Sequence, residues 1–166
     1  MAVDERAFLL LGLHRSGSSA TAGMVHFLGV DMGQNQGLFE NLDFVLINDE
    51  ILWSAGGSWD NPPTRESILQ VEQIDGQPLG MRMASFLEHT RGPAWGVKDP
   101  RLLLTFDLWR PYFEALPQTT YVFIHRPFAA SVRSLPFRDG FWTIRSHTWP
   151  HSTPGWARKA TTMWNW

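Results

Sequence analysis

The first hydrophobic segment of the chain, Ala7–Leu13, is a continuous apolar run. Such a run is typical of a strand that is buried on both faces of a parallel sheet. Residues 12–19 follow as a loop rich in glycine and serine, and apolar residues then recur at helical spacing as far as Leu28. The pattern therefore predicts a strand, a glycine-containing loop and a helix over about residues 18–28, which together begin a βαβ unit.

Further along the chain, apolar side chains on one side predict a helix that Asn41 can cap and that runs to about Trp53. The same pattern predicts helices over residues 79–89, 102–109 and 128–135, and Pro111 is expected to end or bend the helix over residues 102–109. Short hydrophobic segments predict two more strands, at residues 95–97 and 120–124. Residues 136–154 are expected to form a loop, and a last helix is expected from Ala157 to Trp166.

This order of elements predicts an α/β fold with a mainly parallel sheet and helices on both faces, in a single domain over residues 1–166. In such sheets, ligands bind beyond the carboxyl ends of the strands. Polar clusters follow the three predicted strands directly, after Leu13, Val97 and Ile124. We therefore expect the three clusters to lie at one edge of the sheet and to form one site.

The loop over residues 12–19 reads Gly-Leu-His-Arg-Ser-Gly-Ser-Ser and nearly matches the phosphate-binding pattern Gly-x4-Gly-Lys-Ser/Thr. Its glycines let backbone N–H groups approach an anion, and the helix that follows directs its positive end at the same place. Ser18 stands where the pattern has lysine, so the loop favours anion binding but not triphosphate chemistry. Arg15 supplies a positive charge from within the loop. An ordinary tight turn with a solvated Arg15 is the alternative interpretation.

Three segments of the chain, between about Phe8 and Leu135, resemble the P-loop sulfotransferases that use 3′-phosphoadenosine 5′-phosphosulfate. Residues 10–19 resemble the family's 5′-phosphosulfate loop, in which a lysine or arginine lies two residues before the second glycine. Residues 121–135 resemble the 3′-phosphate motif, a strand followed by an arginine and, eight residues later, a serine; Arg126 and Ser134 have this spacing. Residues 95–101 are similar to the Lys-Asp-Pro-Arg segment of many bacterial members.

The resemblance implies a P-loop-type three-layer α/β/α sandwich and transfer of a sulfuryl group to a hydroxyl or amine of a small-molecule or carbohydrate acceptor. The general base is expected to be Glu40, with Asp99 second and His125 third. Lys98 and Arg15 are expected to stabilise the leaving phosphate. The residues expected to bind the donor nucleotide are His14, Arg15, Ser16, Gly17, Ser18, Ser19, Arg126 and Ser134.

Structural roles are the alternatives for these residues. Glu40 can be a carboxylate that favours a helix N-terminus near Asn41, Lys98 and Asp99 can be an ion pair at a strand end, and Arg126 can form a surface salt bridge. The tryptophans are core candidates, although Trp59 and Trp142 are also candidates for an acceptor pocket.

The sequence departs from the family pattern at three places. Arg15 replaces the commoner lysine, and Pro100 stands two residues after Lys98, where steroid and phenol members have a catalytic histidine. The family's later loop over the 3′-phosphate and adenine is not visible before Trp166. Because residues 163–166 are also large and mostly apolar, we expect the sequence to lack its C-terminal part, which bears on the activity of this chain.

Composition narrows the possible classes of protein. Hydrophobic residues make up 43% and charged residues 18%, as in a globular domain, and the net charge of −2 lacks the basic excess of a nucleic-acid-binding protein. The chain has no cysteine, which excludes disulfides and thiolate metal sites, and its six histidines have no metal-ligand spacing, so no metal is expected. The apolar run Ala7–Leu13 is too short to span a membrane and lacks the flanks of a signal peptide, so we expect a cytoplasmic protein without a membrane partner.

Two other functions remain open at this point. A P-loop kinase or nucleotide hydrolase would use the same kind of loop, but it needs the absent loop lysine and a Mg²⁺-binding aspartate at a strand end. A non-catalytic remnant that binds anions is the other alternative.

Overall fold

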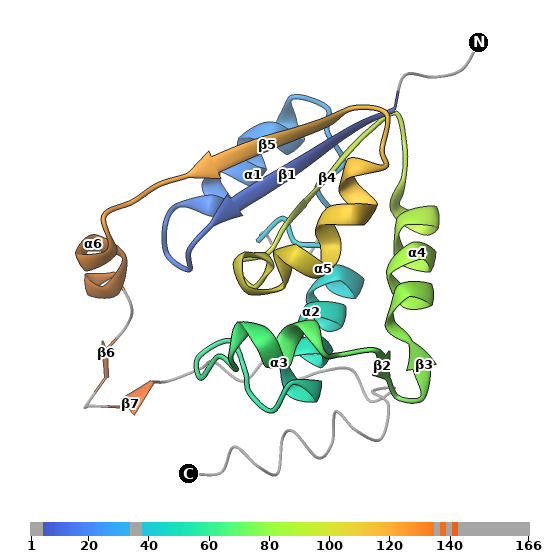
Figure 1. Cartoon of the computed structure of the whole chain (residues 1–166). Coiled ribbons are helices and arrows are strands. Elements are labelled where there is room, and N and C mark those ends of the chain that lie inside the picture. The colour runs from blue at the N-terminus through green and yellow to red at the C-terminus, as the bar shows by residue number, and fades with distance from the viewer. Residues whose placement is uncertain (1–4, 34–37, 135–136, 139–140, 143–166) are drawn as a thin grey trace, which may run out of the picture. The chain divides into compact units, whose positions relative to one another are not determined.

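The computed structural model describes residues 5–33, 38–134, 137–138 and 141–142 (Figure 1). The chain divides into two compact units, Met1–Ser134 and Leu135–Trp166. In the second unit the described residues form an antiparallel pair of short strands, β6 (Phe137–Arg138) and β7 (Phe141–Trp142). All the elements that bear on the candidate site belong to the first unit.

The first unit is built on a sheet of three parallel strands (Figure 1). Strand β1 (Arg6–Gly12) lies in the middle, between β4 (Ala94–Lys98) and β5 (Thr119–Ile124). Leu10 is in register with Lys98 on one side, and Gly12 is in register with Ile124 on the other. The predicted parallel pairing of the first strand with residues 120–124 is therefore confirmed, and the carboxyl ends of all three strands lie at one edge.

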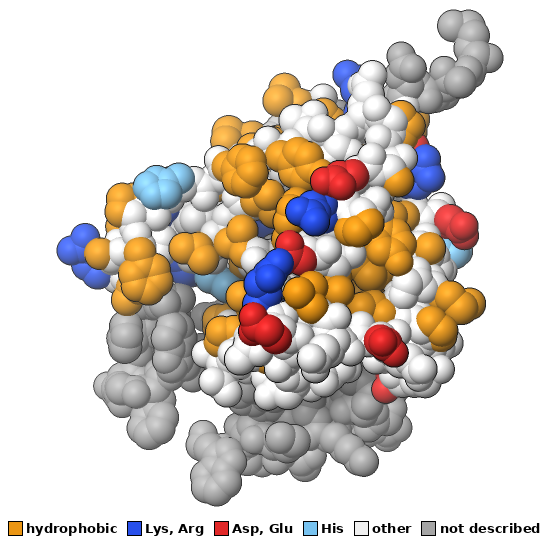
Figure 2. All heavy atoms as spheres, in the orientation of Figure 1, with side chains coloured by type: hydrophobic (Ala, Val, Ile, Leu, Met, Phe, Trp, Pro, Cys, Tyr) orange, Lys and Arg blue, Asp and Glu red, His pale blue; other side chains and the backbone are white. Residues whose placement is uncertain are grey.

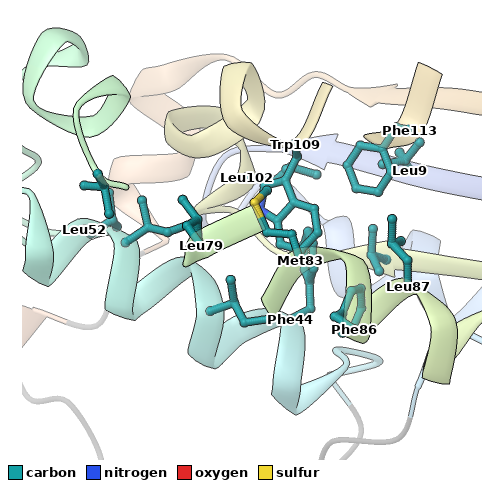
Figure 3. Close-up of a cluster of buried hydrophobic side chains, with 14 of the residues drawn as sticks. Leu9, Phe44, Leu52, Leu79, Met83, Phe86, Leu87, Leu102, Trp109 and Phe113 are labelled. Atoms are coloured by element: carbon teal, nitrogen blue, oxygen red, sulfur yellow. The ribbon is translucent and has the colours of Figure 1, made fainter. Parts of the chain in front are cut away.

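Alternate side chains of β1 enter two different hydrophobic clusters, as the two-residue period of a strand requires. Leu10 packs with Ala22 of α1 (Ser18–Phe27), so α1 covers one face of the sheet. Leu9 and Leu11 pack on the other face with side chains of α2 (Leu42–Ser54), α4 (Leu79–Thr90) and α5 (Leu102–Glu114) (Figure 3). The expected α/β architecture with helices on both faces is therefore present.

Aromatic rings fill the larger of the two clusters (Figure 3). The ring centroids of Phe44 and Trp109 are 4.7 Å apart, and Trp109 stacks on Phe113 at 5.5 Å. The indole N–H of Trp109 donates a hydrogen bond to Asn48 Oδ1 at 2.8 Å. A buried indole N–H needs such a partner, which explains the polar side chain of Asn48 in this core. Asn48 also contacts the network at the strand ends described below.

The predicted cap of α2 is confirmed. Asn41 Oδ1 accepts hydrogen bonds from the backbone N–H groups of Asp43 and Phe44, at 3.0 and 3.4 Å. These bonds satisfy helix donors that have no partner within the helix. The cap fixes the start of α2 and, with it, the position of Glu40 directly before the helix.

The structure differs from the predicted elements at several places. Helix α5 does not end near Pro111 but continues through it to Glu114, because Trp109 and Phe113 on either side of the proline are fully buried and hold the last turn against the core. Helix α6 (Phe128–Arg133) is slightly shorter than expected. The prediction of a loop over residues 136–154 is wrong at residues 137–138 and 141–142, which pair as β6 and β7. The rest of that segment and the helix expected from Ala157 lie outside the described residues.

Besides β6 and β7, one short helix and one short hairpin were not predicted. Helix α3 (Arg65–Leu69) begins after Thr64, whose Oγ1 accepts a hydrogen bond from the N–H of Ser67. Strands β2 (Gln73–Ile74) and β3 (Gln77–Pro78) form a hairpin around Asp75 and Gly76, which both have positive φ. An Asp-Gly pair favours this kind of turn, so the signal was present in the sequence.

Charged side chains of both signs are interspersed with hydrophobic ones on the face drawn in Figure 2. Among the described residues, no helix combines the length and the apolar content that crossing a membrane would require.

Candidate functional site

The loop between β1 and α1 has the backbone geometry of an anion-binding turn. Arg15 and Gly17 both have left-handed backbone conformations, with φ of 64° and 96°. The N–H of Ser16, between them, donates to the carbonyl of Leu13 at 3.1 Å. Alternation of left- and right-handed residues can turn successive N–H groups toward one side. The N–H of Ser16 is already used by Leu13, so the donors for an anion are those at the start of α1. Residues 12–19 therefore form the expected turn between a strand and a helix.

Helix α1 offers free donors at the same place. The first backbone N–H groups of a helix have no acceptor within it, and Gly17, at the N-cap of α1, has no side chain to supply one. The helix dipole adds partial positive charge there. The N-terminus of α1, including Ser18 and Ser19, is therefore able to bind an anionic group.

Gly12 brings this loop close to β5. A Cβ atom on Gly12 would lie 2.8 Å from Ser16 Oγ and 3.1 Å from Ile124 Cβ, so only glycine fits without a shift. Ser16 is 9% exposed, and its hydroxyl has no hydrogen-bond partner among the described residues. A buried hydroxyl without a partner is uncommon and is a candidate contact for a ligand.

Lys98, the last residue of β4, joins the loop to the segment before α2. Its ammonium donates to Ser19 Oγ at 3.1 Å and to Glu40 Oε1 at 2.5 Å. The Lys98 side chain is 2% exposed and that of Glu40 is 12% exposed. A buried ammonium requires an anionic partner, and Glu40 supplies it across 58 positions of sequence. The structure thus brings Lys98, Ser19 and Glu40 together.

A second cluster joins the ends of β1 and β5. Arg126 Nη1 donates to the carbonyl of Arg15 at 2.8 Å and to Ser134 Oγ at 3.4 Å. Arg15 Nε donates to the carbonyl of Ser134 at 3.1 Å. Both arginines lie at the same edge of the sheet, as predicted. Neither forms an ion pair with a carboxylate among the described residues, so Arg126 does not make the surface salt bridge considered above.

Asp99 lies next to Lys98 in sequence but belongs to a different network. Its carboxylate is fully buried, and Oδ1 accepts hydrogen bonds from the backbone N–H and Nη1 of Arg101, both at 3.0 Å. Oδ2 accepts from Asn48 Nδ2 at 2.9 Å. The alternative of a Lys98–Asp99 ion pair is not realised, because Lys98 is paired with Glu40.

Sequence reasoning missed the remaining members of this network, Asn48, Asp49 and Arg101. Arg101 Nε donates to Asp49 Oδ1 at 2.5 Å. Burial raises the pKa of Asp49 to about 6, with Asp99 and Glu40 adding to the increase and Arg101 opposing it. The available signal was the position of Asp49 on the apolar side of a predicted helix, where a carboxylate needs a partner.

His14 packs beside Trp59, with ring centroids 4.5 Å apart. Burial lowers the pKa of His14 to about 4, and the positive charge of Arg101 contributes. Its Nε2 atom is buried without a hydrogen-bond partner among the described residues. Trp59 therefore lies beside the loop, as an acceptor-pocket residue would, whereas Trp142 belongs to the other unit. His125, the third candidate base, is exposed just after β5.

Within the described ranges, no group of three or more histidine, aspartate or glutamate side chains is arranged to hold a metal ion. No model of a known protein family matches the chain, and no curated protein or solved structure matches it. The function is therefore inferred from the site itself.

Proposed function

We propose that this protein is a P-loop sulfotransferase that moves a sulfuryl group from 3′-phosphoadenosine 5′-phosphosulfate to a hydroxyl or amine of a small-molecule or carbohydrate acceptor. The observation that carries the proposal is the network of Arg15, Arg126 and Ser134, which unites two cationic side chains from two strand ends without a carboxylate among the described residues. The donor carries negative charge at both ends, and each end needs basic or N–H donor groups.

The two clusters divide the donor between them. The backbone amides at the N-terminus of α1 and the hydroxyls of Ser16, Ser18 and Ser19 bind the 5′-phosphosulfate. The guanidinium of Arg126 and the hydroxyl of Ser134 bind the 3′-phosphate. Arg126 suits this role because its planar fork matches two phosphate oxygens at once. Arg15 lies between the clusters, since its backbone is part of the loop and its side chain contacts Ser134.

In the transfer step, the acceptor oxygen or nitrogen attacks sulfur while the bond between sulfur and the bridging phosphate oxygen breaks. The electron pair of that bond leaves with adenosine 3′,5′-bisphosphate, and the acceptor's proton passes to Glu40. Lys98, which contacts the loop through Ser19, and Arg15 stabilise the charge that develops on the bridging oxygen. Lys98 is effective here because it is a buried cation held in place, which needs little reorganisation, whereas Arg15 acts from an exposed position.

Among the candidate bases, the contacts favour Glu40. Asp99 is fully buried, and both of its oxygens already accept hydrogen bonds from Asn48 and Arg101. Glu40 retains some exposure and contacts the ammonium that faces the loop. We therefore assign Asp99 a positioning role, in which it fixes the carboxyl end of β4 and thereby the direction of Lys98.

Nucleotide binding by calorimetry tests the proposal. Wild-type protein is expected to bind adenosine 3′,5′-bisphosphate, and Arg126→Ala to bind it about ten- to a hundredfold more weakly, because hydrogen bonds to a charged group are lost. Arg133→Ala is the matched control, since it removes an exposed arginine from α6 whose side chain forms no hydrogen bond with Arg15 or Ser134 among the described residues. Its affinity should be unchanged.

The competing functions predict different results in nucleotide binding or in a sulfuryl-transfer assay. A P-loop kinase or nucleotide hydrolase would bind ATP with Mg²⁺ in preference to the bisphosphate, which would refute the sulfotransferase proposal. A non-catalytic remnant would bind the bisphosphate but transfer no sulfuryl group to any acceptor tested.

A further inference from the structure

The ammonium of Lys98 is shared between the phosphate loop and Glu40. It is almost fully buried, and it contacts Ser19 Oγ at 3.1 Å and Glu40 Oε1 at 2.5 Å. A buried cation needs compensation, and without a ligand Glu40 provides it from within the chain. A sulfuryl group bound at the loop would bring a second anion to the same ammonium.

We propose that Glu40 and the donor's sulfuryl group compete for Lys98, so that donor binding releases Glu40 to act as the base. This inference rests on the proposed function and adds an order of steps to it: the donor binds first, and Glu40 becomes available as the base afterwards. While Glu40 accepts a hydrogen bond from Lys98, Oε1 is bonded to the ammonium and the whole carboxylate is held toward Lys98 rather than toward an acceptor. Once Lys98 turns to the sulfuryl group, the oxygen becomes free.

Electrostatics explains why the two anions exclude each other. An ammonium has three N–H donors, so hydrogen-bond counting alone would let Lys98 bind both groups. Two negative charges on one buried ammonium lie close together, however, and like charges repel strongly where water is excluded. The group that leaves is Glu40, because the loop amides and the N-terminus of α1 hold the sulfuryl end of the donor as well.

The backbone before Glu40 is consistent with this movement. Phe39 has a φ of 53°, a left-handed conformation that is uncommon for a residue with a bulky side chain. Its ring packs close to Gly23 of α1, where a Cβ would lie 2.9 Å from Phe39 Cε2. Phe39 is therefore anchored on α1, while the strained conformation lies directly beside the carboxylate that has to move.

Two ligands that differ only in the sulfuryl group isolate the competition. We would measure the affinity of 3′-phosphoadenosine 5′-phosphosulfate and of adenosine 3′,5′-bisphosphate for wild-type protein and for Glu40→Gln, by calorimetry without acceptor. Removing the competing charge should tighten phosphosulfate binding roughly three- to tenfold and leave bisphosphate binding unchanged within about twofold. With an acceptor, the same variant should turn over more slowly despite its tighter donor binding, a split that a merely structural role would not produce.

Asp43→Asn is the matched control, because it removes one carboxylate from the exposed first turn of α2 without touching Lys98. It should leave both affinities unchanged. Should Glu40→Gln fail to fold, Glu40→Asp keeps the charge but withdraws it by one methylene, and a smaller increase in phosphosulfate affinity is expected.

The outcomes separate the two proposals. If wild-type protein binds the bisphosphate but neither Glu40 variant binds the phosphosulfate more tightly, the competition is refuted and the proposed function stands. If wild-type protein binds neither nucleotide, the proposed function itself fails.

Discussion

Two partly buried side chains near the site, Asp49 and His14, should give the free energy of unfolding opposite dependences on pH. The pKa of Asp49 is raised from 3.8 to about 6, so the folded protein binds this proton more readily than the unfolded chain does. Its contribution to the free energy of unfolding therefore falls as the pH rises from about 4 to about 6. The pKa of His14 is lowered from 6.5 to about 4, so its contribution is complete above pH 6.5 and is lost as the pH falls toward 4.

The two effects have similar size. Shifts of about two pKa units or slightly more each correspond to about 3 kcal/mol, at about 1.4 kcal/mol per unit. In the wild-type protein the two slopes largely cancel between pH 4 and 6. Asp49→Asn removes the descending contribution, so the stability of this variant should rise with pH by about 3 kcal/mol more than that of the wild type. His14→Gln should do the reverse.

Urea denaturation at several pH values between 4 and 7.5 measures these slopes. The other titratable groups near the site are the same in the wild type and in these two variants. A difference in the pH dependence of the free energy of unfolding therefore reports on Asp49 or His14 alone. Asp43→Asn, which removes an exposed carboxylate from the same helix as Asp49, is the control and should run parallel to the wild type. If Asp49→Asn also ran parallel to the wild type, Asp49 would not be the buried carboxylate that the Arg101 network indicates.

Two further predictions concern the strand end at β4. Lys98→Ala should lower turnover by about a hundredfold or more but leave the affinity for adenosine 3′,5′-bisphosphate unchanged, because the Lys98 ammonium acts on charge that develops only in the transition state. If Lys98→Ala and Arg126→Ala lost nucleotide affinity equally, Lys98 would be a cofactor ligand instead. Asp99→Ala should lower the free energy of unfolding, measured by urea denaturation, by about 3–5 kcal/mol, because it removes a buried partner of Arg101. A loss below about 1 kcal/mol would contradict the buried contact between Asp99 and Arg101.

The elements with the clearest hydrophobic pattern were predictable from the sequence. The runs that became β1 and β5 are apolar and bounded by polar clusters, and parallel strands place such clusters at one edge. This rule alone was enough to bring Arg15 near Arg126 and the loop near Lys98. The cap of α2 was predictable because Asn41 precedes an apolar periodic segment.

The partners of the charged side chains could not be predicted in this way. Lys98 and Asp99 are neighbours in sequence, which suggested an ion pair, but successive side chains along a strand direction point to opposite sides. Lys98 therefore meets Glu40, and Asp99 meets Asn48 and Arg101. The pairings of Lys98 with Glu40 and of Asp99 with Asn48 depend on tertiary packing across more than 50 positions of sequence, on which local patterns carry no information. Arg101, by contrast, is only two positions from Asp99.

Under the proposed function, the pairing of β1 with β5 also determines how long a ligand the site accepts. The loop follows β1 and Arg126 follows β5, so the register of Gly12 with Ile124 fixes how far apart the two anion-binding clusters lie. A slip of one residue would change that separation by about 3.3 Å, roughly the reach of one hydrogen bond, and would reverse the faces of all the β5 side chains. If the two clusters bind one donor as proposed, the pairing of the strands sets the spacing between the two charged groups of that ligand, and discrimination by length comes from the sheet rather than from the loops that contact the ligand.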